Sequence, residues 1–283
     1  MRNAEWTVRV SIGVASLCDR TVLLNSAFRI PHSALGGAGL SGYWLALDTA
    51  TDTASVAAGR PPAAESGVHV QGARRHAAEI IRLVDFVLRR LSLRPRDLDG
   101  IVVGDGPGSF TGLRIGWSAA KGLAHEAGLD IRAIPSLMAA AAGAAVRLGP
   151  EPVAACFDAL RGQVYGAMYA FHPDRVETLV QPAVLTPEEF ARIAPVRPRL
   201  VVGTGVACFA DQMTSWAGTP PVPLESLPPA ATMLLGLLGR VGVGRLLDDA
   251  AGAEPVYGRP AEAQAQWEAR HGRPFPDSSG HAG

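Results

Sequence analysis

The chain has 283 residues, 48% of them hydrophobic, and its 26 basic residues balance its 26 acidic residues. This length and apolar content are enough for a large buried core and predict two domains. The neutral balance lacks the positive excess of an autonomous nucleic-acid-binding protein, and nothing in it indicates a membrane partner.

Cysteine usage favours a reduced, cytoplasmic protein. Cys18, Cys156 and Cys208 are odd in number and far apart, which does not suit a disulfide scaffold. No C-x-x-C pair is present, so a zinc knuckle is not expected.

Residues 1–42 differ from the rest of the chain. Their apolar run, residues 8–18, is interrupted by Arg9 and is too short to span a membrane. It also makes a poor signal peptide. We expect a poorly ordered extension, or the product of an upstream start codon, and assign it no function.

The first buried strand is predicted at residues 43–48. It ends in the carboxylate of Asp48, and a polar turn beginning at Thr49 leads to a second strand at residues 56–58. A carboxylate at a strand tip suits metal or phosphate chemistry, but it also suits simple bonding to turn amides. Both interpretations remain open.

Residues 72–93 predict a long amphipathic helix, with apolar residues at helical spacing. His76 is the only histidine on it. A metal site built on one helix needs a second ligand near i+4, where this chain has Ile80. We therefore interpret His76 as structural or solvent-facing.

The most distinctive stretch is residues 105–116, a glycine-rich turn between a strand at 101–103 and a helix at 113–126. Ser109 or Thr111 can cap the helix, whose free N–H groups favour an anion. The turn matches neither G-x-G-x-x-G nor the Walker A motif, so a turn that merely starts a packed helix is equally consistent. Gly112, Gly116 and Ala120 form a small-residue ridge that allows close helix packing.

The second half repeats the first. After a boundary at residues 149–152, a strand ending in Asp158 and a second strand follow the plan of residues 45–58, which predicts two halves facing a shared cleft, each contributing an acidic hairpin. A strand and glycine turn at 200–205 either receives a ribose or base or only turns the chain. An apolar helix is expected at 231–247 and an extended segment at 254–261.

Five segments, in the same order, resemble the bacterial TsaB family. They are Leu45-Ala-Leu-Asp-Thr-Ala-Thr51, Gly106-Pro-Gly-Ser-Phe-Thr-Gly-Leu-Arg-Ile-Gly116, Phe157-Asp-Ala-Leu-Arg-Gly-Gln-Val-Tyr165, Val202-Gly-Thr-Gly205 and Glu254-Pro-Val-Tyr-Gly-Arg259. The resemblance covers residues 43–260. It implies an α/β, actin-like (ASKHA) fold of two duplicated ribonuclease-H-like lobes, at 43–149 and 150–262. The Gly, Pro, Ser and charged residues after Arg270 predict a flexible tail at 263–283.

The resemblance also implies a function. TsaB-like proteins are partners and scaffolds of the transferase TsaD, which with the ATPase TsaE installs N6-threonylcarbamoyladenosine in tRNAs that read codons beginning with A. TsaD-like proteins bind a metal through an H-x-x-x-H pair, which this chain lacks. We therefore expect no catalytic residue, no metal and no tightly bound cofactor. ATP or ADP at the complex interface, weak ATPase activity and a homodimer stay open.

The expected partner contact is the helix pair at about 73–93 and 111–126, with tRNA bound indirectly through the complex. The interface candidates are Ala77, Ile80, Ile81, Val84, Leu88, Gly112, Gly116 and Ala120, although half of them are equally suited to face the lobe's own sheet. The candidates for nucleotide or phosphate binding are Asp48, Thr49, Gly106, Gly108, Ser109, Thr111 and Asp158. The alternatives are a glycoprotease-like metallopeptidase or a small-molecule kinase of the actin fold, and a self-associating scaffold.

Overall fold

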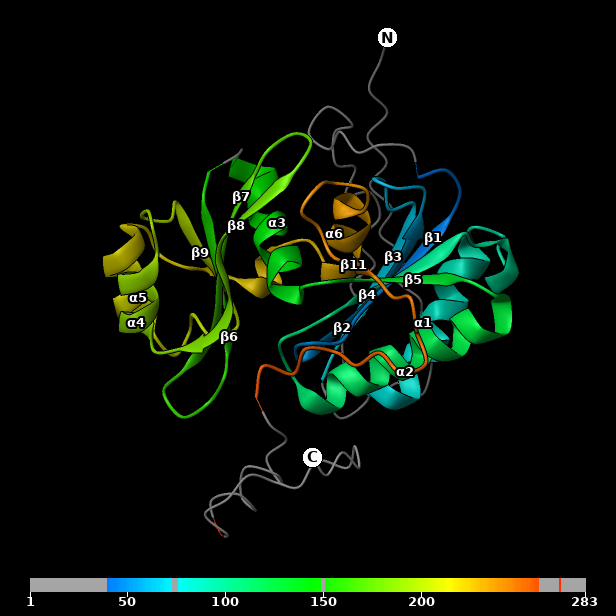
Figure 1. Cartoon of the computed structure of the whole chain (residues 1–283), viewed down its shortest axis with the longest axis horizontal. Helices are drawn as coiled ribbons and strands as arrows, with labels where there is room; N and C mark the ends of the chain where they lie inside the picture. The colour runs from blue at the N-terminus through cyan, green and yellow to red at the C-terminus, as the bar shows by residue number, and fades with distance from the viewer. Residues whose placement is uncertain (1–39, 73–75, 149–150, 260–269, 271–283) are drawn as a thin grey trace, which may run out of the picture.

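The computed structural model describes residues 40–72, 76–148, 151–259 and 270. These residues form two β-sheets with helices between them and on their outer faces (Figure 1). The predicted extension at 1–42 and the predicted tail at 263–283 lie almost wholly outside the described residues.

The first sheet has the strand order β11-β5-β4-β1-β2-β3. Its members are β1 (Trp44–Asp48), β2 (Thr53–Gly59), β3 (Ser66–Gln71), β4 (Gly100–Gly104), β5 (Asp130–Ile134) and the short β11 (Arg245–Leu246). Strands β1, β2 and β3 are antiparallel neighbours, whereas β4 and β5 run parallel to β1. Strands β1 and β4 are buried along their whole length, as their uninterrupted apolar sequences require.

The second sheet has the same plan, in the order β10-β9-β6-β7-β8. It contains β6 (Val153–Asp158), β7 (Val164–Phe171), β8 (Val176–Leu185), β9 (Leu200–Gly203) and β10 (Val222–Pro223). Strands β6, β7 and β8 are antiparallel, and β9 and β10 are parallel to β6. The predicted duplication is therefore confirmed, and the fold is the actin-like pair of ribonuclease-H-like lobes.

Each sheet has helices on its outer face. Helices α1 (His76–Arg90) and α2 (Phe110–Ala127) cover the first sheet through a core that includes Leu47, Val87 and Trp117. Helices α4 (Pro187–Ile193) and α5 (Ala210–Ala217) cover the second sheet around Phe190 and Met213. Two short 3₁₀ turns, η3 (Pro95–Asp97) and η4 (Leu224–Ser226), lie in connections of the described part of the chain.

Two helices lie between the sheets, and each packs on the sheet formed by the other half of the sequence. Helix α3 (Ser136–Leu148) follows the first sheet in sequence but packs on β6 and β7, whereas α6 (Ala230–Leu237) follows the second sheet but packs on β1 and β2 (Figure 1). One core cluster consequently contains Trp44 of the first sheet, Tyr169 of the second and Leu234 of α6. The predicted boundary near residue 149 lies between β5 and β6, but α6 and β11, which follow it in sequence, pack on or join the first sheet.

The helix expected at 231–247 is shorter than predicted. It ends at Leu237, and Gly239, Gly242 and Gly244 then adopt left-handed conformations with φ of +88°, +78° and +67°. Glycine populates this region without a steric penalty. The chain thereby turns back and adds β11 to the edge of the first sheet, antiparallel to β5.

Candidate functional site

The glycine-rich turn of residues 105–116 wraps around the turn that follows β1. Four glycines touch that turn so closely that a Cβ atom has no room. A Cβ on Gly104 would lie 2.0 Å from Asp48 Oδ2, on Gly108 2.2 Å from Ala50 O, on Gly112 2.1 Å from Thr49 O, and on Gly116 2.3 Å from Thr49 Oγ1. The glycines are therefore needed for packing of the chain against itself.

Hydrogen bonds join the same two segments. The N–H of Ser109 donates to Ala50 O at 2.7 Å, and Thr49 Oγ1 donates to Gly112 O at 2.7 Å. Ser109 caps α2 by accepting from the Gly112 N–H at 3.1 Å, which confirms the predicted cap. The protein itself thus satisfies these hydrogen-bond donors and acceptors. The geometry therefore favours a packed turn over an open phosphate-binding loop at Thr49, Gly108 and Ser109.

A C-terminal segment closes over this turn. We call residues 254–259 the strap. The N–H of Val256 donates to Asp105 O at 2.8 Å, and Gly106, with φ of +88°, makes room for Val256 O. Arg245 binds both carboxylate oxygens of Asp105 at 3.1 Å. Burial raises the pKa of the Asp105 carboxyl, and the guanidinium of Arg245 opposes that rise.

The strap connects the glycine turn to the second lobe. Tyr257 accepts a hydrogen bond from Arg114 Nε at 3.2 Å and packs on Phe110 with a centroid distance of 4.5 Å. Two residues later, Arg259 donates to Gln163 in the β6–β7 hairpin. Four of the five segments that carried the resemblance, at 45–51, 106–116, 157–165 and 254–259, are thus joined by contacts.

Asp48 is a desolvated carboxylate. Its side chain is 2% exposed, accepts from Ser136 Oγ at 2.6 Å, and accepts from the Ala50 N–H at 3.2 Å. Burial raises the pKa of Asp48 to about 6, although both hydrogen bonds oppose the rise. Each of its oxygens thus accepts one hydrogen bond from the protein, one of them from a turn amide, and each keeps the capacity to accept a second.

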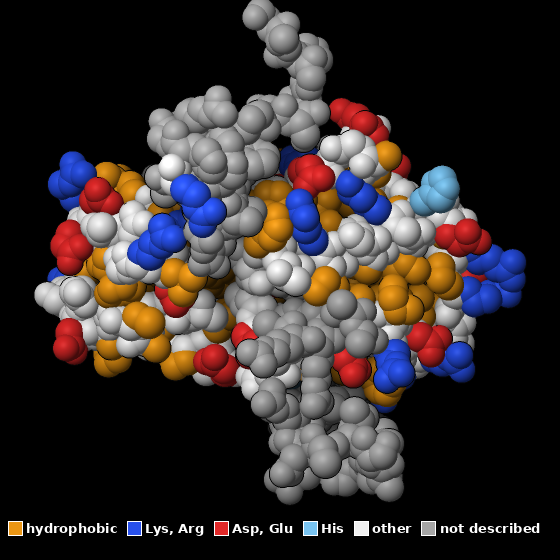
Figure 2. Space-filling model, turned by 90° about the horizontal axis from the view of Figure 1, so that it is seen from below, with side chains coloured by type: hydrophobic (Ala, Val, Ile, Leu, Met, Phe, Trp, Pro, Cys, Tyr) orange, Lys and Arg blue, Asp and Glu red, His pale blue; other side chains and the backbone are white. Residues whose placement is uncertain are grey.

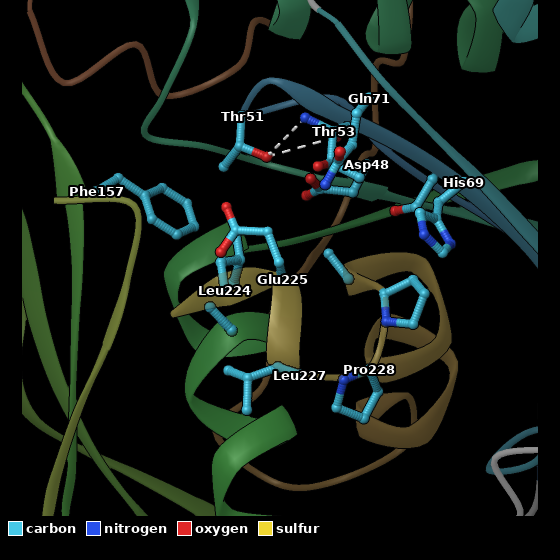
Figure 3. A pocket seen from close by; sticks show the side chains of 14 residues that line it. Asp48, Thr51, Thr53, His69, Gln71, Phe157, Leu224, Glu225, Leu227 and Pro228 are labelled. Atoms are coloured by element: carbon cyan, nitrogen blue, oxygen red, sulfur yellow. Dashed lines mark hydrogen bonds between the residues drawn. The ribbon is translucent and has the colours of Figure 1, made fainter. Parts of the chain in front are cut away.

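A cavity of about 290 Å³ lies beside Asp48, between the first sheet and the segment that joins η4 to α6. Figure 3 shows Asp48, Thr53 and Gln71 on the sheet side, Glu225 opposite them and Phe157 at one end. Asp158 does not line it. That carboxylate is exposed and accepts from Leu160 N at 2.8 Å, so it stabilises its own turn. The expectation of two acidic hairpins at one cleft is therefore wrong for Asp158, and Phe157 takes its place.

A shallow groove runs between α1 and α2 on the outer surface. It is lined by Ile80, Ile81, Phe110, Thr111, Arg114, Ile115, Ser118 and Ala119. Figure 2 looks onto the side where these helices lie and shows hydrophobic side chains gathered there among charged ones. Among the groove residues, Ile81 is 53% exposed. Exposed apolar surface rimmed by polar residues is typical of interaction sites.

Most of the predicted interface residues are buried in the protein's own core. These are Ile80, Val84, Leu88, Gly112, Gly116 and Ala120. Only Ile81 presents a largely exposed side chain, and the side chain of Ala77 lies outside the described residues. The ridge of small residues packs on Thr49, so it does not receive a partner helix. Its burial corrects that prediction.

Sequence reasoning missed Phe110, Arg114 and Ile115, which line the groove on α2. Positions 110, 114 and 118, and positions 111, 115 and 119, form two neighbouring rows at i, i+4 spacing on this helix. That spacing is readable from the sequence. The more conspicuous spacing on α2 is that of Gly112, Gly116 and Ala120, which lie on the opposite, buried face.

Comparison with known proteins decides the family. A protein of Escherichia coli K12 named tRNA threonylcarbamoyladenosine biosynthesis protein TsaB is 31% identical over 219 residues, which span 75% of this chain and 93% of that protein. The chain belongs to the TsaB family.

Other comparisons agree with this family. The Bacillus subtilis protein of the same name is 29% identical over 235 residues, covering 79% of this TsaB-family chain and 96% of the relative. The solved structure of YeaZ from Pseudomonas aeruginosa superposes with a TM-score of 0.64 at 30% identity, covering 77% and 100% of the two chains. Residues 64–204 also match the TsaD family, described as tRNA N6-adenosine threonylcarbamoyltransferase.

In the described part of this TsaB-family chain, no three His, Cys, Asp or Glu side chains are grouped as metal ligands. None of the helices in that part combines the length and hydropathy that crossing a bilayer requires. The side chain of His76 lies outside this part, and Ile80, four residues on, is buried in the core.

The close packing of Gly116 on Thr49 predicts how substitution there changes the free energy of unfolding. Gly116→Ala should lower the free energy of unfolding by about 1–3 kcal/mol, because its Cβ would crowd the buried Thr49 hydroxyl. Gly122→Ala, on the same helix, meets nothing within 4 Å and should raise it by up to about 1 kcal/mol through helix propensity. Urea unfolding followed by circular dichroism measures both, and equal shifts would contradict the packed ridge.

The burial of Asp48 predicts how the free energy of unfolding depends on pH. The pKa of Asp48 is about 6 in the folded chain and near its ordinary value of 3.8 in the unfolded chain, so the folded chain binds the proton more tightly. The free energy of unfolding should therefore fall as pH rises from about 4 to 7, by on the order of 2–3 kcal/mol relative to Asp48→Asn.

The control for that measurement is Asp211→Asn, at an exposed carboxylate on α5. Its pH profile should follow that of the unmodified chain in chemical denaturation at each pH. If Asp48→Asn shows the same pH dependence as the unmodified chain, Asp48 does not carry the buried ionisation.

Proposed function

We propose that this chain acts in the biosynthesis of threonylcarbamoyladenosine in tRNA, as a non-catalytic partner of a TsaD-type transferase in a complex with TsaE. The names of the E. coli and B. subtilis relatives support the pathway. The observation that carries the partner role is the exposed apolar groove between α1 and α2. The proposed complex is cytoplasmic and meets tRNA through its other subunits.

The internal contacts of the glycine turn support a non-catalytic role. Phosphoryl transfer depends on loops and charges that hold phosphate oxygens. Here the backbone of the turn is packed on Thr49 and Ala50, and Asp48 is bound by Ser136 and its own turn. These contacts disfavour the kinase alternative. The metallopeptidase alternative lacks a second histidine four residues from His76.

The groove supports a specific mode of association. Ile80 forms its floor, and Ile81, Phe110 and Ile115 line it with apolar surface. Arg114 is held over the Phe110 ring at 4.3 Å and bonded to Tyr257, so a charged group is fixed at this surface. Helices α1 and α2 are therefore the proposed contact, as expected, but through their exposed rows. ATP or ADP, if bound in the complex, belongs at this interface.

Ile81→Asp should weaken binding of the TsaD-type partner at least about tenfold, because a charge would be buried against an apolar surface. The matched control is Ile193→Asp on α4, where the isoleucine is 43% exposed and distant from the groove. Substitution at the buried Ile80 or Val84 is unsuitable because it would disturb the fold. Calorimetric titration with the partner, together with circular dichroism, makes the measurement.

Unchanged affinity of the Ile81→Asp variant would remove the groove from the heterodimer. Analytical ultracentrifugation of the chain alone tests whether the same surface instead forms a homodimer. A dimer that Ile81→Asp converts to monomer, without any effect on the partner, would instead indicate a homodimer interface.

Reconstitution tests the function as a whole. The chain mixed with its TsaD-type and TsaE-type partners should support modification of tRNA, read as threonylcarbamoyladenosine by mass spectrometry of nucleosides. Omitting this chain should remove the product, and the chain alone should neither turn over ATP robustly nor retain stoichiometric metal. Robust turnover or tight metal in the isolated chain would overturn the non-catalytic role.

A further inference from the structure

The cavity beside Asp48 has a polar side and an apolar side. The polar side comes from β1, β2 and β3 and presents Thr51, Thr53 and Gln71. The apolar side comes from the segment before α6 and from the end of β6. Its members are Phe157, Leu224, Leu227, Pro228, Pro229 and Ala230, with Ala140 of α3. Such a cavity suits a small molecule with one polar end.

The charged side chains that line the cavity are acidic. Asp48 and Glu225 contribute carboxylates, and no Lys or Arg occurs among the described residues that line the cavity. Figure 3 shows Glu225 reaching toward the sheet from the opposite wall. Phosphates bind where Arg, Lys or free backbone N–H groups converge. This lining therefore repels a phosphate and favours a donor with positive charge.

His69 adds a second polar feature to the wall. Its Nδ1 atom is buried and has no hydrogen-bond partner among the described residues. Burial lowers the pKa of His69, so its imidazole is neutral at pH 7 and adds no positive charge to the cavity. A buried polar atom without a partner is costly, and a bound ligand or water that reaches it would relieve that cost.

We propose that this cavity binds a small organic cation, a primary ammonium group carried on a compact apolar body. The ammonium lies between the carboxylates of Asp48 and Glu225, and the apolar body packs on Phe157 and Leu224. A volume of about 290 Å³ restricts the ligand to a small metabolite. The site is separate from the α1–α2 groove and does not depend on the proposed partner role.

Three probes of similar shape and different charge test this site on the full chain. Benzylammonium, benzyl alcohol and benzoate are titrated by calorimetry at pH 7.5, and amide shifts in the ¹H–¹⁵N spectrum locate each one. Benzylammonium should bind at least about tenfold more tightly than the other two, since only it pairs with the carboxylates. Its shifts should fall on His69, Phe157 and Leu224.

Two variants and a control assign the charge. Glu225→Gln changes an exposed residue and leaves the fold intact, so it should weaken benzylammonium binding about threefold to tenfold. Asp48→Asn should weaken it at least about tenfold. Glu188→Gln, at an exposed carboxylate on α4, should stay within about twofold of the unmodified chain.

The same titrations can overturn the proposal. Benzoate binding in the cavity as tightly as benzylammonium would show that the site takes anions. Absence of saturable benzylammonium binding up to about 10 mM would show that the cavity is not a cation site. Binding that Glu225→Gln and Asp48→Asn leave unchanged would place the ammonium elsewhere. None of these outcomes bears on partner binding at the groove.

Discussion

The structure depends on how closely the turn after β1 approaches the glycine-rich turn after β4. Oxygens of Thr49 and Ala50 occupy the places where Cβ atoms of Gly108 and Gly112 would otherwise lie. This approach holds α2 against the first sheet and seals Asp48 below it. The two backbones can approach this closely because glycine has no side chain. Packing alone therefore accounts for the unusual glycine content of residues 104–116.

Two surfaces follow from this arrangement, and they face different directions. Helix α2 presents its exposed rows, including Phe110 and Ile115, to the groove shared with α1. On the other face of the same sheet, Asp48 lines the cavity near the start of α6. The strap connects the first surface to the second lobe through Tyr257 and Arg259.

The sequence predicted the central strands and the long helices because their hydrophobic patterns are strong. It did not predict β3 (Ser66–Gln71) or β8 (Val176–Leu185), the edge strands of the two sheets. Both are only partly buried, so their patterns are weak, and Pro182 interrupts β8. For the site, periodicity located α1 and α2 but not the faces they expose. Ile80 and Ile81 are neighbours in sequence, yet one is buried and the other is half exposed.

The sequence by itself determined the duplicated strand plan, the capped start of α2 and the family, because these depend on local spacing and on motifs. Only the tertiary structure decided that α3 and α6 exchange sheets, that the glycine ridge faces inward, and that Phe157 and Glu225 share a cavity with Asp48. Each of these depends on contacts between residues far apart in the chain. Local pattern restricts which residues are buried, but the partner against which they are buried is fixed only when the sheets and helices pack together.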